Sequence, residues 1–201
     1  MFGARGTGKT HLLWHRYNQK ANWYIDLLNP DLSRRYLLNP AVLIQELAAR
    51  HPRPEWVMID EVQKVPALLD VVHKVIEETG QKFILSGSSA RKLKRGAANL
   101  LAGRAFVYNL FPLTATELAE SFNLNDALQW GTLPKLLELD DVGDKKDFLR
   151  SYANTYVREE ILQEQIVRKL EPFHRFLSIA AQMSGRVINY SNIALDTGTT
   201  V

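Results

Sequence analysis

The eight residues Gly3–Thr10, which read GARGTGKT, have the types and spacing of a loop that binds phosphate groups. They fit the pattern G-x-x-x-x-G-K-S/T, in which glycines let successive backbone N–H groups converge on one anion. In this pattern Lys9 would reach the β- and γ-phosphates of a nucleotide, and the Thr10 hydroxyl would bind Mg²⁺. The alternative is a glycine-rich turn before a helix. The predicted phosphate-binding residues are Gly3, Ala4, Arg5, Gly6, Thr7, Gly8, Lys9 and Thr10.

Two adjacent acids follow a short apolar run, WVMI, at residues 56–59. Such a run is typical of a strand buried on both faces, and an open parallel sheet binds ligands at the carboxyl ends of its strands. Asp60 would hold Mg²⁺, directly or through water, and Glu61 would activate an attacking water. A solvated acidic pair at a strand end is the alternative, which the phosphate loop upstream disfavours.

The next apolar run, KFIL, leads into three serines, Ser86, Ser88 and Ser89. A hydroxyl at this strand exit could position the attacking water or contact the γ-phosphate. Ser88 is the predicted residue, and an ordinary serine-rich turn is the alternative.

Basic residues gather after these serines. An arginine near the γ-phosphate would neutralise the charge that develops in the transition state. Arg104, which lies between an apolar stretch and a predicted strand, is the candidate for that role; a structural ion pair is the alternative. Four other basic residues lie in the same stretch, and for them the alternative to a role near the phosphates is a solvated basic loop. They are Arg91, Lys92, Lys94 and Arg95.

These residues need a scaffold of alternating strands and helices, which the first 110 residues supply. Alternation of this kind predicts an α/β fold with a parallel sheet and helices on both faces. The pattern from Thr114 onward is helical almost throughout, with a linker predicted at 131–146 (GTLPKLLELDDVGDKK). Strands are predicted at 22–28, 55–61, 82–89 and 105–110, and helices at 9–20, 40–50, 66–80, 145–170 and 171–185.

Composition excludes several classes of protein. The chain has 201 residues and a net charge of only +3, too weak by itself to indicate nucleic acid or an anionic membrane. It has no cysteine, which excludes disulfides, thiolate nucleophiles and cysteine-bound zinc. No stretch has the length and apolarity of a membrane span, and no signal peptide is evident. A cytoplasmic location is expected.

Several segments together resemble the prokaryotic AAA+-type P-loop ATPases that carry a C-terminal domain of unknown function. The resemblance spans essentially the whole chain, and the order of the segments is its most specific part. It implies that Lys9 and Thr10 are Walker A residues, that Asp60 and Glu61 are Walker B residues, and that Arg104 is the family's AGR arginine. The segments are GARGTGKT, WVMIDEVQKVPALLDVVHKVIE, FILSGSSARKL, NLLAGRAFVYNLFPLTATEL and YVREEILQEQIVRKLEPFHRFLSIAA.

The resemblance also implies a domain plan. Residues 1–120 would form the ATPase core, 121–170 a helical lid region, and 171–201 the start of a winged-helix-like domain. In that last part, Ser191–Asp196 would be the first helix of a helix-turn-helix and Thr197–Gly198 its turn.

Three features depart from the family's pattern. Thr132 replaces a commoner glycine in the turn GTLP. Only Met1 and Phe2 stand where the family has an apolar strand, and the last residues stop within the winged helix. We therefore expect a fragment of a longer protein, with reduced stability and activity.

The predicted function is ATP binding and hydrolysis with Mg²⁺. A non-catalytic remnant or interaction module is the alternative, and it would bind a partner protein or DNA through the C-terminal region. No membrane partner is expected, and the sequence leaves the oligomeric state open.

Overall fold

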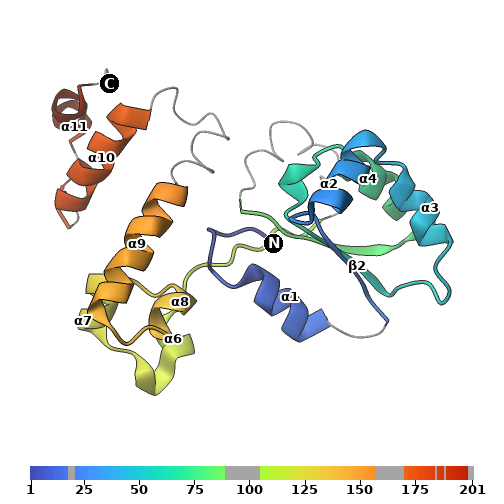
Figure 1. Cartoon of the computed structure of the whole chain (residues 1–201), viewed down its shortest axis with the longest axis horizontal. Helices are drawn as coiled ribbons and strands as arrows, with labels where there is room; N and C mark the ends of the chain where they lie inside the picture. The colour runs from blue at the N-terminus through green and yellow to red at the C-terminus, as the bar shows by residue number, and fades with distance from the viewer. Residues whose placement is uncertain (18–20, 89–104, 157–169, 184, 188, 199–201) are drawn as a thin grey trace. The chain divides into compact units, whose positions relative to one another are not determined.

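The computed structural model describes residues 1–17, 21–88, 105–156, 170–183, 185–187 and 189–198. The chain forms two compact units, Met1–Phe148 and Leu149–Val201, and Figure 1 shows the elements of both. The predicted residues Ser89, Arg91, Lys92, Lys94, Arg95 and Arg104 lie outside the described residues.

A parallel three-stranded sheet is the centre of the first unit. Its strands are β1 (Trp23–Asp26), β2 (Trp56–Asp60) and β3 (Lys82–Leu85), in the order β1-β2-β3. The register places Ile25 beside Ile59 and Ile59 beside Leu85. All three strands were predicted from the sequence, and their parallel pairing confirms the α/β class.

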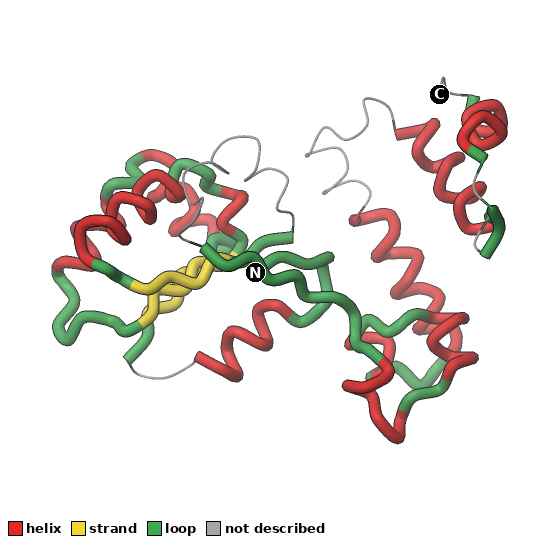
Figure 2. Tube along the Cα trace, turned by 180° about the vertical axis from the view of Figure 1, so that it is seen from behind, coloured by secondary structure: helices red, strands yellow, loops and turns green. Residues whose placement is uncertain are grey.

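Helices cover both faces of this sheet. α1 (Lys9–Tyr17) lies on one side of the strands, and α2 (Pro30–Leu38), α3 (Val42–Ala48) and α4 (Leu68–Thr79) lie on the other (Figures 1 and 2). Both connections step across the sheet in the same direction, from β1 to β2 and from β2 to β3. Crossovers between parallel strands share one hand as a rule, so α2, α3 and α4 are expected on the same face.

The main core lies between the sheet and that second group of helices. It contains fully buried side chains from β1, β2 and α4, including Ile25, Ile59 and Leu68. Met58 points to the opposite face of β2 and is buried outside this cluster, as is Leu13 of α1. Alternate residues of β2 are thus buried on both faces, as its continuous apolar run predicts.

α2 forms where the sequence patterns above predict no element. Asn29 caps it, because its side-chain oxygen accepts hydrogen bonds from the backbone N–H groups of Asp31 and Leu32. Pro30 occupies the first helical position, where its missing N–H costs nothing. The local signal for a helix start was therefore present in the sequence.

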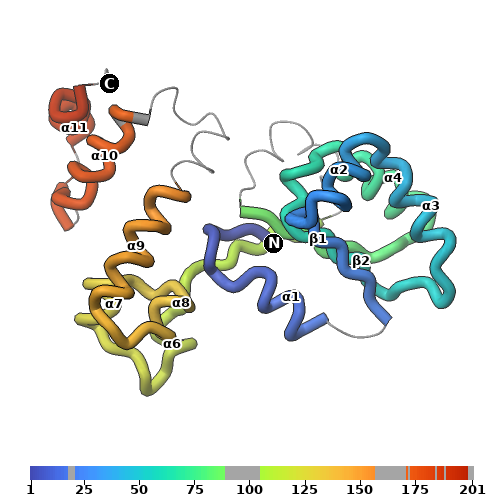
Figure 3. The backbone as a smooth tube through the Cα atoms, in the orientation of Figure 1, coloured from blue at the N-terminus to red at the C-terminus, as the bar shows by residue number. Residues whose placement is uncertain are grey.

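The strand predicted at Ala105–Leu110 is wrong. This segment makes one isolated parallel bridge, between Phe2 and Asn109, while Phe2 bridges Gly87 on its other side. The backbone N–H of Phe2 donates to Tyr108 at 2.8 Å, and that of Leu110 donates to Phe2 at 2.6 Å. Figure 3 shows the blue N-terminal stretch beside the yellow-green one. Among the described residues, Phe2 is the bridge partner of this segment, and the segment's Phe106 is 87% exposed, so its apolar side chains are not covered as in a buried strand.

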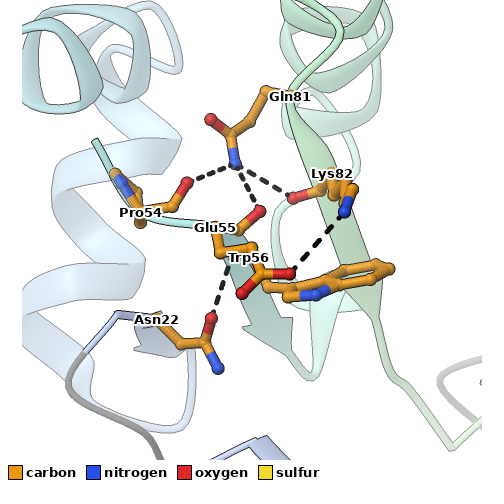
Figure 4. A network of polar contacts seen from close by, with 6 residues as sticks. All are labelled: Asn22, Pro54, Glu55, Trp56, Gln81 and Lys82. Atoms are coloured by element: carbon orange, nitrogen blue, oxygen red, sulfur yellow. Dashed lines mark hydrogen bonds and ion pairs between the residues drawn. The ribbon is translucent and has the colours of Figure 1, made fainter. Parts of the chain in front are cut away.

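Polar side chains tie the amino ends of β2 and β3 together. Gln81 Nε2 lies within hydrogen-bond distance of the carbonyl oxygens of Pro54, Glu55 and Lys82. Asn22 accepts a hydrogen bond from the Trp56 backbone, and Lys82 forms an ion pair with Glu55 (Figure 4). This network fixes the strands at the end of the sheet opposite to Asp60.

Short helices complete the first unit. The predicted linker at 131–146 is wrong, because Pro134 starts a helix there and Leu133 and Leu136 are buried. The remaining helices that begin in the first unit are η1 (Val62–Lys64), α6 (Ala115–Leu118), η2 (Ala119–Ser121), α7 (Leu124–Trp130), α8 (Pro134–Leu137) and α9 (Val142–Tyr156). Helix α9 continues past Phe148 into the second unit.

In the second unit, α10 (Leu170–Gln182) packs against α11 (Tyr190–Thr197). α11 is capped by Gly198, whose φ of 69° is left-handed, so the helix predicted at Ser191–Asp196 is confirmed and extends through Thr197, which was predicted to lie in the turn. The winged helix itself stays a prediction. None of the helices in the described ranges is long and apolar enough to cross a membrane.

Candidate functional site

The loop before α1 has the backbone conformation that its glycines allow. Gly6 and Gly8 have φ values of 78° and 91°, in the region that favours glycine. Gly3 is needed for a different reason, because a Cβ there would lie 2.2 Å from the carbonyl oxygen of Leu110. Thr7 braces the loop, since its hydroxyl donates to the Ala4 carbonyl at 2.9 Å.

Lys9 extends across this loop and is only 5% exposed. Its ammonium group donates to the carbonyl oxygens of Gly3 at 2.8 Å and Ala4 at 2.9 Å. A buried ammonium is costly unless it is hydrogen-bonded, so these contacts hold the charge inside the loop. The lysine thus lies where the sequence motif predicts, at the start of α1.

Asp60, at the end of β2, is the centre of a polar cluster and is 1% exposed. Its Oδ2 accepts from the Thr10 hydroxyl at 2.6 Å and from the Tyr24 phenol at 2.8 Å. Its Oδ1 accepts from the Ser86 hydroxyl and from the Glu61 backbone N–H. Donors from α1, from β1 and from beyond β3 therefore converge on one carboxylate, which compensates for its burial.

Tyr24 is a permanent donor in this cluster. Burial raises the pKa of the Tyr24 phenol well above its ordinary value, and its hydrogen bond to the Asp60 carboxylate raises it further. The phenol therefore stays protonated and donates to Asp60. Its ring lies 5.4 Å from that of Trp14, in a tilted arrangement.

Glu61 follows Asp60 in a left-handed conformation, with φ 58° and ψ 41°. Its carboxylate accepts a hydrogen bond from Gln63 Nε2, and the same nitrogen donates to the Ser88 hydroxyl at 3.0 Å. The two residues predicted for catalysis in the described ranges, Glu61 and Ser88, are therefore connected through a third that was not predicted.

The structure brings together most of the predicted residues that it describes. Thr10 and Asp60, the predicted Mg²⁺ ligands, are in direct contact. Arg5 and Thr10 are exposed at the loop. Sequence reasoning missed Tyr24 and Gln63, and it preferred Ser88 to Ser86, which is the serine that contacts Asp60. A polar residue at a strand exit was the only signal for Ser86.

The Thr10 and Asp60 oxygens suit a magnesium ion. Mg²⁺ prefers hard oxygen ligands in octahedral geometry at about 2.1 Å, which places neighbouring ligands about 3 Å apart. Thr10 Oγ1 and Asp60 Oδ2 are separated by 2.6 Å, so a small adjustment would let both bind one ion. The donor set therefore fits the cation that accompanies a nucleotide.

This combination of a parallel sheet, a glycine-rich loop before a helix and an acid pair at a neighbouring strand end defines a phosphate-loop nucleotide-binding domain. Residues 1–119 match the family described as "AAA domain", and residues 121–201 match a domain of unknown function (DUF8612). The chain belongs to the AAA domain family. At the level of that family, it is a nucleotide-binding protein of the AAA type.

A relative with similarity along almost the whole chain is an uncharacterized protein, MJ1544, of Methanocaldococcus jannaschii. The two are 21% identical over 216 aligned residues, which cover 96% of this chain and 48% of that protein. The chain thus spans about half the length of the curated relative that it matches.

Proposed function

We propose that this chain binds ATP with Mg²⁺ and hydrolyses it to ADP and phosphate. The observation that carries the proposal is the hydrogen bond between Thr10 and Asp60, which joins the phosphate loop to the end of β2. The buried ammonium of Lys9, which donates to the carbonyl oxygens of Gly3 and Ala4 in the same loop, supports the proposal as well. The membership of the AAA domain family supports the same activity.

Each group at the loop has a role in binding. The backbone N–H groups of Gly3–Thr10 and the N-terminus of α1 would hold the phosphates. Lys9 would exchange its carbonyl contacts for β- and γ-phosphate oxygens. Thr10 and Asp60 would hold Mg²⁺, whose charge offsets that of the transferring phosphoryl group.

The chemical step would depend on Glu61. Its carboxylate would accept a proton from the attacking water, while the γ-phosphoryl group leaves ADP and becomes phosphate. Ser88 would orient that water or contact the γ-phosphate. Arg104, carried over from the resemblance, would neutralise charge on the transferring group.

The region after residue 120 would couple this activity to a partner. We retain the domain plan of an ATPase core at 1–120, a helical lid region at 121–170 and the start of a winged helix at 171–201. The winged helix would bind DNA or a partner protein. The match of 121–201 to a separate domain supports a division near residue 120.

The test is a titration of a fluorescent ATP analogue with Mg²⁺ against the wild type, Lys9→Ala and Lys64→Ala. Lys64 is an exposed lysine of the same unit and serves as the matched control. Loss of a hydrogen bond from a charged donor, about 1.5–3 kcal/mol, predicts an affinity roughly 10- to 150-fold weaker for Lys9→Ala. Thermal melts would confirm that each variant is folded. Equal affinities for Lys9→Ala and the wild type would refute the proposed nucleotide site.

A further inference from the structure

The side-chain amide of Gln63 spans the exits of β2 and β3. One hydrogen of Nε2 points to the carboxylate of Glu61 and the other to the hydroxyl of Ser88, at 3.0 Å. Both N–H groups of this amide therefore donate to the two residues that would act on the attacking water in the proposed hydrolysis. Glu61 and Ser88 follow different strands, so Gln63 fixes one relative to the other.

The backbone directs Gln63 to this position. Glu61 adopts the left-handed conformation, which a residue other than glycine keeps only where its surroundings hold it. The next residue, Val62, is fully buried, and its N–H donates to the Ser86 carbonyl at 3.0 Å. Lys64 N–H then donates back to the Glu61 carbonyl at 2.9 Å. The chain therefore reverses immediately after Glu61 and brings the side chain of Gln63 alongside it.

The orientation of the amide follows from charge and space. With Nε2 toward the Glu61 carboxylate, Gln63 Oε1 faces Gly87, where a Cβ would lie 2.3 Å from it. Gln63 Oε1 is buried and accepts no hydrogen bond within the described part of the chain. The reversed amide would set two oxygens against each other at Glu61, so the contact with the carboxylate outweighs the unpaired carbonyl.

We propose that Gln63 is the positioning residue for Glu61: its amide holds the carboxylate at the exit of β2 and links it to Ser88. The inference rests on the proposed hydrolysis, in which Glu61 accepts the proton of the attacking water. A general base works only within hydrogen-bond reach of that proton. A base that is held loosely therefore lowers the rate of the chemical step and leaves substrate binding unchanged.

A kinetic cycle tests this role. Gln63→Met keeps the length of the side chain and removes both donors, and Gln45→Met makes the same exchange at an exposed residue of α3. Because a misplacement of about 1 Å can cost about 100-fold in rate, Gln63→Met should lower kcat by about 10- to 100-fold. The KM for ATP should stay within about twofold of the wild type.

The double variant separates positioning from a general loss of structure. If Gln63 acts through Glu61, Glu61→Gln together with Gln63→Met is no slower than Glu61→Gln alone. Losses that multiply, or a kcat of Gln63→Met equal to that of Gln45→Met, would overturn the inference.

A spectroscopic measurement tests the contacts of Gln63 independently of the ATPase activity. The side-chain amide signals of Gln63, assigned by their absence in Gln63→Met, should move in Glu61→Ala and in Ser88→Ala. If the wild type does not turn over ATP, or Glu61→Gln is as fast as the wild type, the proposed function fails, and the positioning role fails with it. Amide signals that do not move would show that Gln63 does not hold Glu61 and Ser88, and they would overturn the inference whatever the ATPase rate.

Discussion

The hydrogen bond from Tyr24 to Asp60 offers a test of the polar cluster that needs no nucleotide. Tyr24→Phe removes one hydroxyl and leaves the ring, with its tilted contact to Trp14, in place. The phenol donates to Asp60 Oδ2 at 2.8 Å, and Asp60 is 1% exposed. Water therefore has little access to the carboxylate that the variant leaves with one donor fewer.

The expected cost follows from the charge on the acceptor. A hydrogen bond to a charged group contributes about 1.5–3 kcal/mol to stability, against about 1 kcal/mol for a neutral pair. Thr10 still donates to the same oxygen, so we expect a loss of roughly 2 kcal/mol in the free energy of unfolding. For a domain of this size, that corresponds to a fall in Tm of about 4–8 °C.

Thermal and urea unfolding followed by circular dichroism would measure this loss. Tyr17→Phe is the matched control. The ring of Tyr17 also makes a tilted contact with a tryptophan, Trp56, but its hydroxyl makes no hydrogen bond to the described residues. Its Tm should change by less than about 2 °C, as for a substitution within about 0.5 kcal/mol. If Tyr24→Phe melts with this control, the phenol does not stabilise Asp60 and the reasoning on the cluster is refuted.

Two further predictions concern catalysis and pH. Glu61→Gln should bind the ATP analogue as the wild type does and release phosphate about 10²–10⁴-fold more slowly; unchanged turnover would show that Glu61 is not the base. Burial, together with hydrogen bonds to Asp60 and Glu46, raises the pKa of Tyr24 and Tyr36 in the folded chain, so above a pH of about 10 the unfolded chain loses these protons first. The stability from both tyrosines is complete below that pH and declines above it. Urea unfolding between about pH 9 and 11 should show a shallower decline for Tyr24→Phe and Tyr36→Phe, and slopes equal to that of the wild type would contradict this.

The sequence by itself determined the parts of the site that depend on local conformation. Glycine is needed at position 8, which the motif specifies, because the loop has a positive φ there, and Gly6 meets the same need at a position that the motif leaves open. The apolar run before Asp60 predicted a buried strand, because a strand covered on both faces has no polar side. The cap at Asn29 was equally local, although no helix was predicted from it.

Only the tertiary structure decided which side chains meet at the site. Tyr24 and Ser86 reach Asp60 from segments 36 and 26 residues away, and no local pattern encodes a contact across that distance. The Ala105–Leu110 segment has the composition of a strand, yet a strand also needs a partner of matching length, and within the described ranges its bridge is to Phe2 alone. Gln63 is near Glu61 in the sequence, but it turns toward Glu61 only because the buried Val62 pairs with Ser86 and Gly87 leaves room for its amide.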